Sequence, residues 1–495
     1  MDPITILLSI IICISFLYVS YGWSKNEYQN FPPGPKPLPI IGNMHILDLK
    51  KPFNSMLQLS EKYGSIFSIQ IGTKKAVVLC GYEMVRDALV NHADEFAGRP
   101  KLQIFEDVTQ GHGLIFSRDE NWKVMRRFTL STLRDFGMGK KSLENKIYEE
   151  CDSLVQKLHS YNGKRFENSM IMNAAVANII VSILLDRRFD YEDPTILRLL
   201  HLINENIRLM GMLFLVNFFK LYNTFPSLLR WLPGSHKTIH KQVDEMMIFV
   251  KDTFTSQRNE LDINNQRNLI DAFLVKQQEE IPSAEVYFHD KNLSMLVIDL
   301  FSAGMETTST TLRWGLLLMM KYPEIQRKKV QNEIEKVIGL AQPQTEHRKE
   351  MPYTDAVIHE MQRFGDIVPG NLPHATTQDI TFKGYFIPKD TYVIPLLTSV
   401  LRDKTYFEKP EEFYPQHFLD SKGKFVKPEA FMPFSAGRRS CAGENLAKME
   451  LFLFFTRLLQ NFTFHPPPGE KLDLTPVCGL TTPPKAYYMC AIPRN

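Results

Sequence analysis

One short segment constrains this chain more than any other: a loop that carries a single cysteine directly before a long apolar helix. The loop reads Phe434-Ser435-Ala436-Gly437-Arg438-Arg439-Ser440-Cys441-Ala442-Gly443, and the predicted helix runs from Glu444 to Leu459. Backbone N–H groups at a helix N-terminus favour a thiolate, and glycines permit backbone geometry that side chains block. The arrangement suits a large planar cofactor better than a small ion. The loop alone does not exclude a buried, inert cysteine.

The other cysteines and the charge balance exclude several classes of protein. The six cysteines lie at positions 13, 80, 151, 441, 478 and 490, and no two have CxxC spacing. This argues against a disulfide scaffold and a structural zinc site, and it fits a reducing compartment. The net charge of +3, from 58 basic and 55 acidic residues, is too close to balance to indicate a nucleic-acid partner.

The N-terminal segment predicts a membrane anchor. No charged residue lies between Asp2 and Lys25, and the interval is long enough to cross a bilayer as one helix of about 20 apolar residues. Basic residues follow this segment and none precedes it, so the positive-inside rule leaves the rest of the chain in the cytoplasm. A cleaved signal peptide is disfavoured because it needs a basic leader and a shorter apolar core. Residues 1–25 are the predicted anchor, and 26–49, which include Pro32 to Pro39, are a proline-rich hinge that acts as a semi-rigid spacer.

The remainder, residues 50–495, predicts one large domain that is mainly α-helical with a minor β-sheet near its N-terminal side. Strands are expected at Ser65–Ile71, Ala76–Leu79 and Asp379–Phe386. The helices are too many and too uneven for a bundle. Apolar residues at helical spacing predict helices at Asn54–Lys62, Tyr82–Asn91, Trp122–Leu133, Leu143–Leu158, Ala174–Leu185, Ile196–Asn217, His240–Glu260 and Pro323–Val337.

A polar patch interrupts the long helical run from Leu293 to Met320. Gly304 and the neighbouring hydroxyl residues make the helix locally weak. Thr307 can donate a hydrogen bond to the Ala303 carbonyl and bend the helix, and Gly304 would let a flat ligand approach the backbone. The residues alone favour a buried helix whose threonines satisfy themselves.

Two further pairs are uninformative by themselves. Glu360 and Arg363 share one helix face and can pair, as many surface pairs do. Trp122 and Arg126 also share a face, and an arginine can donate two parallel hydrogen bonds to a carboxylate.

Together these patterns resemble the cytochromes P-450. The cysteine loop fills every fixed position of the FxxGxRxCxG haem signature, and ExxR, AGx(D/E)T and WxxxR are all matched. The similarity covers nearly the whole chain and points to the vertebrate microsomal family two, with a fish subfamily as the match within it. The resemblance to family two rests on the Pro-Pro-Gly-Pro, Phe-Ala-Gly-Arg-Pro, Ala-Gly-Met-Glu-Thr-Thr-Ser-Thr-Thr-Leu and Ala-Gly-Arg-Arg-Ser-Cys segments.

The resemblance implies the cytochrome P-450 fold around haem b, with Cys441 as the axial thiolate ligand of the iron. Thr307 is implied to stabilise iron-bound O2, and Glu306 to pass protons toward it. For Arg99 and His374 a second interpretation stays open, in which they are an ordinary surface arginine and an ordinary loop histidine and do not contact the haem. The other implied haem contacts are Phe434, Gly437, Gly443, Ala303 and Gly304, and the implied propionate contacts are Arg99, Trp122, Arg126, His374 and Arg439.

The resemblance also implies a structural network and a substrate pocket. Glu360 and Arg363 would form the network with His417, where the family often has arginine. A histidine in place of arginine predicts that the third member of this network binds more weakly and is sensitive to pH. The implied pocket residues are Ile115, Phe116, Phe301, Ala303, Val368 and Leu480.

The implied activity is that of a monooxygenase. It would insert one oxygen atom from O2 into lipophilic substrates (xenobiotics, fatty acids, steroids or other lipids) by hydroxylation or epoxidation. Electrons would come from NADPH through the membrane NADPH–haemoprotein reductase, with cytochrome b5 as a further partner. The protein would be located in the endoplasmic reticulum (microsomal) membrane, with its catalytic domain on the cytoplasmic face. Candidate reductase contacts are Lys123, Arg127, Arg134, Lys140, Arg438 and Lys448.

Alternatives remain for one segment and for the activity. The apolar stretch Ile207–Leu232 is either a mobile roof that dips into the bilayer or plain helix packing. A haem-thiolate isomerase or dehydratase is a rival activity, although such enzymes tend to lack the groove threonine. A haem sensor or a non-catalytic haem protein is disfavoured by Glu306 and Thr307.

Overall fold

The computed structural model describes residues 2, 5, 7–15, 30–39, 41–48, 50–72, 74–213, 222, 226, 230–280 and 286–494. The predicted anchor and the predicted roof, Ile207–Leu232, lie partly outside these ranges. Residues 7–15 are helical. Among the described residues, no helix combines the length and the hydrophobicity that crossing a bilayer requires.

The body is mainly helical, as predicted, and one helix runs through its centre. This helix, α13 (Asp290–Lys321), packs against α7 (Ser169–Leu184), α11 (Ser235–Asn259), α16 (Pro352–Gly365) and α18 (Glu444–Asn461). Its C-terminal half is buried nearly all round because other helices surround it. The other α-helices are α2 (Pro52–Tyr63), α3 (Tyr82–Arg86), α4 (Gln103–Thr109), α5 (Asp119–Asp135), α6 (Lys141–Ser160), α8 (Pro194–Leu213), α12 (Leu269–Glu279), α14 (Pro323–Ile325), α15 (Asn332–Val337) and α17 (Leu397–Leu401).

Two predicted helices are interrupted by π-helical turns. The segment Tyr82–Asn91 continues from α3 into η2 (Asp87–Asn91). The segment Pro323–Val337 passes from α14 through η3 (Gln326–Gln331) into α15. Apolar spacing predicts the helix but does not distinguish one turn type from the other. The remaining short helices, all 3-10, are η1 (Met44–Ile46), η4 (Thr345–Glu350), η5 (Pro415–Phe418) and η6 (Gly437–Arg439).

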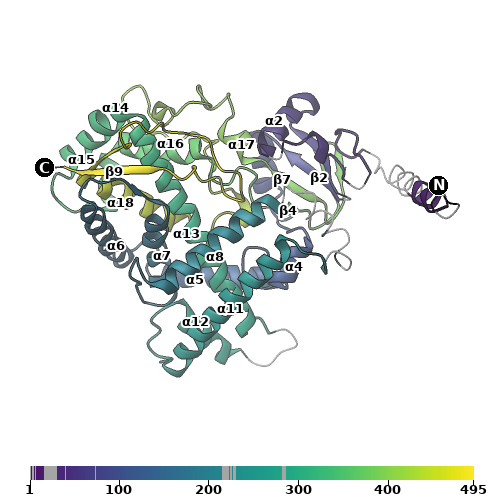
Figure 1. The fold of residues 1–495 in the computed structure, drawn as a ribbon, viewed down its shortest axis with the longest axis horizontal. Coiled ribbons are helices and arrows are strands. Elements are labelled where there is room, and N and C mark those ends of the chain that lie inside the picture. Colours follow the sequence, from purple (N-terminus) through teal and green to yellow (C-terminus); the bar gives the residue numbers. More distant parts are fainter. Residues whose placement is uncertain are drawn as a thin grey trace.

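The main sheet has the strand order β1-β2-β7-β4. Antiparallel β1 (Ile66–Ile71) and β2 (Lys74–Leu79) are the predicted strands, and β2 pairs in parallel with β7 (Tyr392–Pro395). Short β4 (His374–Ala375) pairs with the other edge of β7. The sheet and α2 lie at the end of the body nearer the N-terminus, opposite β9 (Figure 1). The minor sheet is confirmed, whereas its two distant strands were not predicted.

Two smaller sheets complete the fold. The predicted strand Asp379–Phe386 is a hairpin of β5 (Ile380–Phe382) and β6 (Tyr385–Ile387). Lys383 and Gly384 turn it with φ of 50° and 84°. The third sheet has the order β3-β9-β8, formed by Phe166–Glu167, Tyr488–Pro493 and Phe462–His465.

The proline-rich segment lies against β1 and not free of the body. The Ser68 N–H donates to the Pro33 carbonyl at 2.7 Å, and the Ser68 hydroxyl donates to the Pro32 carbonyl at 2.8 Å. A Cβ on Gly34 would lie 2.0 Å from the Ser68 carbonyl oxygen, so this approach requires glycine. The segment expected to act as a spacer is therefore hydrogen-bonded to the sheet at its N-terminal part.

Candidate active site

The loop before α18 presents Cys441. Gly437 has a φ of 73°, and a Cβ there would lie 1.7 Å from the Leu89 carbonyl oxygen, so only glycine fits. The Cys441 N–H donates to the Phe434 carbonyl at 3.0 Å and closes the loop. The Cys441 side chain is exposed, yet the surrounding protein desolvates the thiol and raises its pKa, against the lowering effect of the Gly443 N–H. The N-cap of α18 is Gly443, and a Cβ there would touch the Cys441 sulfur at 4.0 Å.

One face of α13 is open in the middle of an otherwise buried helix. Ala303 is exposed and Thr307, one turn later, is half-buried. The Thr307 hydroxyl donates to the Ala303 carbonyl at 2.8 Å, which confirms the predicted hydrogen bond. Because the Ala303 carbonyl accepts this side-chain hydrogen bond, the helix is locally weaker.

A side chain of the neighbouring helix α7 fills the space beside Gly304. A Cβ at this position would lie 2.5 Å from Cδ1 of Ile180, on α7. The missing side chain therefore lets α7 pack closely on α13. Since Gly304 and Ala303 are adjacent, they point about 100° apart around the helix, and Ala303 is the residue at the open face.

Glu306 is a buried acid at the edge of this face. Thr310 and Thr481 each donate a hydroxyl hydrogen bond to Oε1 at 3.1 Å. Burial raises the pKa of Glu306, and Arg313 opposes that shift. A raised pKa lets a carboxyl group hold a proton near neutral pH. No sequence pattern indicated Thr481, which lies in the C-terminal loop next to Leu480.

Arg439 lies buried beneath the site. Its Nε donates to the Ala97 carbonyl at 2.8 Å and its Nη2 donates to the Ser117 carbonyl at 2.9 Å. Its guanidinium stacks on the Trp122 ring at 3.8 Å from the centroid. Its buried Nη1 has no hydrogen-bond partner within the described chain. Burial, reinforced by Arg99 and Arg126, lowers its pKa to about 7.

Two more arginines and a histidine converge on Arg439. Arg99 is buried and donates to the Ile115 and Pro373 carbonyls at 3.0 and 2.7 Å. Arg126 donates from Nη2 to the Ser440 carbonyl at 2.7 Å. His374 is buried and donates from Nδ1 to the Phe96 carbonyl at 2.7 Å. Desolvation lowers the pKa of Arg99 to about 9 and, with the help of Arg99, that of His374 to about 3.

These cations form an anion site. None of the three arginines makes an ion pair with a carboxylate of the described chain. An unpaired buried charge is costly, so the cluster calls for an external anion, and guanidinium groups suit carboxylates. The two carboxylates of a haem fit this donor set. Arg99 is buried and so is not a surface residue, and His374 lies in strand β4 and not in a loop.

The structural network is closed and fully buried. Arg363 donates to both Glu360 oxygens at 2.7 and 2.8 Å, and it also donates to the carbonyls of Leu401, Pro410 and Glu412. His417 Nδ1 lies 3.2 Å from Glu360 Oε2, and the Lys409 N–H donates to its Nε2 at 3.1 Å. The backbone donor makes Nε2 an acceptor, so Nδ1 carries the proton. Both ring nitrogens of His417 therefore have a partner in the network.

Three loops bring the predicted pocket residues toward α13. Asp299 accepts the N–H groups of Leu114 and Ile115 at 2.7 and 2.9 Å. The Thr482 N–H donates to the Ile367 carbonyl at 3.0 Å, which joins the loops that carry Leu480 and Val368. Ile115, Val368 and Leu480 are half-buried, whereas Phe116 stacks on Phe105 with centroids 3.7 Å apart. Asp299 was not predicted as a site residue, although an acid among the apolar residues of this helix was a visible signal.

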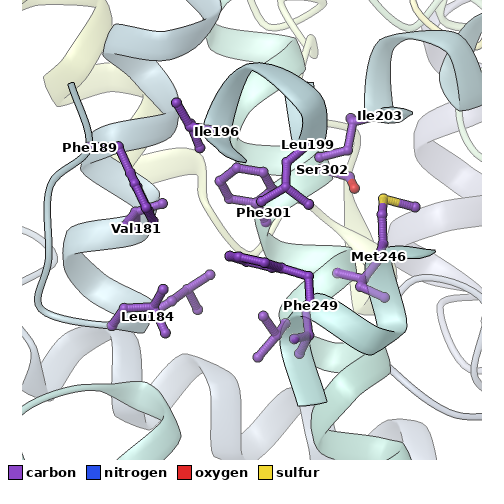
Figure 2. Close-up of a pocket in the computed structure, with 14 residues that line it drawn as sticks. Val181, Leu184, Phe189, Ile196, Leu199, Ile203, Met246, Phe249, Phe301 and Ser302 are labelled. Atoms are coloured by element: carbon purple, nitrogen blue, oxygen red, sulfur yellow. The ribbon is translucent and has the colours of Figure 1, made fainter. Parts of the chain in front are cut away.

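The structure places Phe301 away from the open face. It lines a separate apolar cavity with residues of α7, α8 and α11 (Figure 2). Phe301 and Ala303 are two residues apart, which on an α-helix is about 200° of rotation. The two side chains therefore leave α13 on different sides, and their placement in one pocket stays a prediction.

Half of the candidate reductase contacts are engaged in ion pairs. Lys123, Arg438 and Lys448 pair with Glu120, Asp94 and Glu444 at 2.5, 2.8 and 2.5 Å. Arg127, Arg134 and Lys140 are exposed and make no ion pair within the described chain.

Comparison with known proteins agrees with this geometry. The family model for Cytochrome P450 matches residues 32–491. The chain belongs to the cytochrome P450 family, and it is a monooxygenase. It is 49% identical to Cytochrome P450 2K4 of Oncorhynchus mykiss, over 97% of this chain and 96% of the relative. It is 49% identical to Cytochrome P450 2K6 of Danio rerio, over 92% and 90%, and 46% identical to Cytochrome P450 2C5 of Oryctolagus cuniculus, over 100% of both. The predicted family, including family two and its fish members, is confirmed.

Proposed function

We propose that this chain is a haem-thiolate monooxygenase that hydroxylates or epoxidises lipophilic molecules at the endoplasmic reticulum membrane. The observation that carries the proposal is the cluster of buried Arg99 and Arg439 with half-buried Arg126, which has no carboxylate partner in the described chain. Arg126 donates to Ser440, the residue before Cys441. An anion site next to an exposed cysteine supports binding of a group that needs both.

Haem b is the proposed group. Cys441 would hold its iron, and Arg99, Arg126, Arg439 and His374 would hold its propionates, with Trp122 as the platform beneath Arg439. Phe434, Gly437 and Ala303 would leave room for the ring. A cysteinyl thiolate on haem iron favours cleavage of the O–O bond of bound oxygen, as it does in this family generally.

Protons would reach the site through residues of α13. Glu306 holds a proton more readily than an ordinary carboxyl group because burial raises its pKa. Its hydroxyl partners, Thr310 and Thr481, are positioned to exchange that proton. Thr307 keeps its hydroxyl hydrogen on the Ala303 carbonyl, so its oxygen lone pairs are available to accept a hydrogen bond at the open face.

The substrate would be held by apolar side chains and by a fixed loop. Ile115, Val368 and Leu480 approach the open face from three loops. Asp299 fixes the Ile115 loop by accepting two backbone N–H groups. Such a pocket selects by shape, which suits xenobiotics, fatty acids, steroids or other lipids.

The proposed membrane location and redox partners follow from the family and from the exposed charges of the chain. Residues 1–25 would anchor the chain, 26–49 would link the anchor to the body, and 50–495 would form the catalytic domain on the cytoplasmic face. NADPH–haemoprotein reductase, and cytochrome b5 as a second donor, would dock near the exposed cations Arg127, Arg134 and Lys140.

Reconstituted turnover tests this function. The haem-loaded full chain would be combined with the reductase, NADPH, O2 and lauric acid. Hydroxylated product is expected only when both reductase and NADPH are present. Product formed from a peroxide substrate without NADPH would instead establish an isomerase, and no turnover of either kind would contradict the proposal.

A further inference from the structure

A buried polar stripe runs along one face of α13. Glu306, Thr310 and Arg313 follow one another at spacings of four and three residues, so they share one side of the helix. All three side chains are buried, and the Thr310 hydroxyl donates to Oε1 of Glu306 at 3.1 Å. This stripe, the α13 seam, therefore carries an acid and a cation two turns apart with a hydroxyl group between them.

The C-terminal loop covers the α13 seam and is hydrogen-bonded to both of its ends. The Thr481 hydroxyl donates to Glu306 at 3.1 Å, and the Tyr487 hydroxyl donates to the Arg313 carbonyl at 2.6 Å. Lys485, two residues before Tyr487, is exposed. The Arg313 end of the seam is therefore covered by a loop that borders solvent, whereas the Glu306 end meets the open face of α13.

Arg313 is a buried cation that has no carboxylate in direct contact with it. Its Nη2 makes a long contact of 3.5 Å with the Pro484 carbonyl, and its buried Nε has no hydrogen-bond partner within the described chain. Long side chains on a helix point back toward the helix N-terminus, which directs the guanidinium of Arg313 toward Glu306. A buried cation is costly unless an opposite charge compensates it, and Glu306 is the acid on its side of the helix.

The charge of Arg313 acts on Glu306 from a distance. Burial raises the pKa of Glu306, and the largest effect that opposes this rise is the charge of Arg313. Arg313 is the charged group of the described chain that acts on this acid. The titratable neighbour of Arg313 is Tyr487, which burial keeps neutral by raising its pKa. Because the surroundings are buried, the two charges are screened far less than exposed ones.

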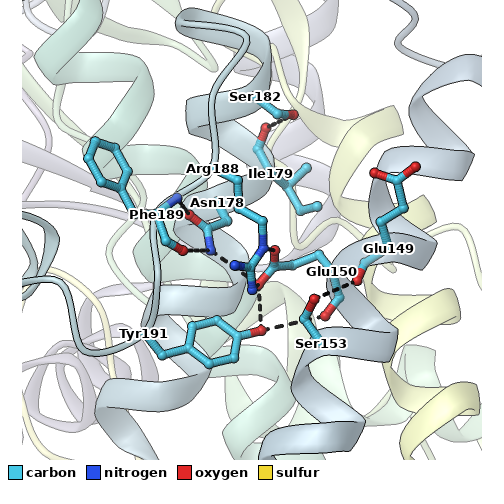
Figure 3. Close-up of polar contacts among 9 residues, drawn as sticks. All are labelled: Glu149, Glu150, Ser153, Asn178, Ile179, Ser182, Arg188, Phe189 and Tyr191. Carbon is cyan, nitrogen blue, oxygen red and sulfur yellow. Dashed lines mark hydrogen bonds and ion pairs between the residues drawn. The ribbon is translucent and has the colours of Figure 1, made fainter.

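Figure 3 shows a buried acid of a different kind. Glu150, on α6, accepts a hydrogen bond from Arg188 at 2.7 Å. The Tyr191 hydroxyl and the Asn178 amide donate to the same carboxylate. A guanidinium in direct contact favours the ionised acid and cannot pass on a proton. Glu306 contacts hydroxyl groups instead, which both donate and accept, so its proton can be exchanged.

We propose that Arg313 is a positioning residue for Glu306, because it stabilises the ionised form of this acid across the Thr310 hydroxyl. The O–H bond of Glu306 breaks as its proton passes to an oxygen acceptor at the open face. The carboxylate then persists under the influence of Arg313 until a proton from bulk water restores the O–H bond. This inference rests on the proposed role of Glu306 in proton supply.

Infrared titration of the haem-loaded full chain tests the proposal. The carboxylic acid C=O band of Glu306 is isolated at each pH as the difference between proteins with and without Glu306→Gln. Arg313→Gln keeps a hydrogen-bond donor for the Pro484 carbonyl but removes the charge. It should raise the midpoint of the Glu306 titration by about one pH unit, which is a tenfold weaker acid. Arg313→Lys keeps the charge and should return the midpoint toward that of the parent.

The matched control is Arg327→Gln, which removes an exposed arginine and should leave the midpoint unchanged. Equal midpoints in the parent and Arg313→Gln, or equal displacement in Arg313→Lys and Arg313→Gln, would overturn the proposal. If Arg313→Gln does not fold, the parent decides: buried glutamates without a cation titrate at about pH 8–9, so a parent midpoint in or above that range would also overturn it. The infrared band needs no turnover, so a protein that forms no product would contradict the proposed function and leave this test intact.

Discussion

The guanidinium of Arg439 lies 3.8 Å from the centroid of the Trp122 ring. The stacked geometry leaves Nη1 of Arg439 buried and without a hydrogen-bond partner in the described chain, although Nε and Nη2 are both satisfied by carbonyls. The Trp122 ring therefore holds Arg439 in an orientation that leaves Nη1 available to bind an anion.

Replacing this platform should loosen haem binding. Trp122→Ala removes a cation–π contact of about 1–2 kcal/mol, which corresponds to about a tenfold faster loss of haem if the lost energy affects only the bound state. Haem transfer to an excess of apo-globin measures the rate. Trp231→Ala, which removes a tryptophan that is 81% exposed, is the control and should leave the rate unchanged. Equal rates for Trp122→Ala and the parent would show that the platform is not needed.

Breaking the Glu360–Arg363 pair should be severe. Both side chains are fully buried, so Arg363→Ala leaves a carboxylate without its partner, at a cost of about 3–5 kcal/mol in the free energy of unfolding. Urea unfolding followed by circular dichroism measures it. The matched control is Lys328→Ala, in the exposed pair with Glu324, for which a change below about 0.5 kcal/mol is expected. Similar small changes in both variants would refute the structural role.

Removing the Thr307 hydroxyl should uncouple electron use from product formation. In Thr307→Ala the open face lacks the hydroxyl that is bound to the Ala303 carbonyl, and loss of a positioned proton-transfer group typically costs about 100-fold or more. We expect NADPH consumption to continue with hydrogen peroxide in place of most product. Thr307→Ser keeps the hydroxyl and should retain most of the coupling. Unchanged product per NADPH in Thr307→Ala would argue against this role.

Glu450 should make stability depend on pH. This acid, on α18, is buried and accepts a hydrogen bond from the Thr308 hydroxyl, and burial raises its pKa from 4.5 to about 8. The folded state therefore keeps a proton that the unfolded state releases, so stability falls as pH rises from about 5 to 8. Glu450→Gln lacks this proton.

The advantage of Glu450→Gln over the parent should be small at pH 5 and should grow by up to about 1.4 kcal/mol per pH unit toward pH 8. Urea unfolding of both proteins across this range measures it. The exposed Glu408 supplies the control Glu408→Gln, which should show no such growth. A constant difference between Glu450→Gln and the parent would contradict the raised pKa.

Residue patterns predicted the parts of the site that lie close together in the sequence. The cysteine loop, the Thr307–Ala303 hydrogen bond and the Glu360–Arg363 pair each depend on residues within ten positions of one another. Local spacing also predicted most helices. The parallel pairing of β2 with β7 was not predictable, because it joins Ala76 to Tyr392.

Sequence was least informative about helix faces and loop contacts. Phe301 and Gly304 were assigned to the ligand side of α13, but both face neighbouring helices. A helix that is apolar nearly all round gives no signal of which face meets a cofactor. The bond from Asp299 to the Ile115 loop and the contact of Thr481 with Glu306 depend on the packing of distant loops, which one sequence does not encode visibly.

The most direct test is the absorption of the dithionite-reduced, CO-bound protein. A thiolate ligand from Cys441 predicts a strongly red-shifted Soret band in the intact chain and its loss in Cys441→Ser. Cys151→Ser, which changes a buried cysteine elsewhere in the fold, should keep the band. An ordinary haem–CO band in the intact protein, or a red-shifted band that survives in Cys441→Ser, would contradict the account.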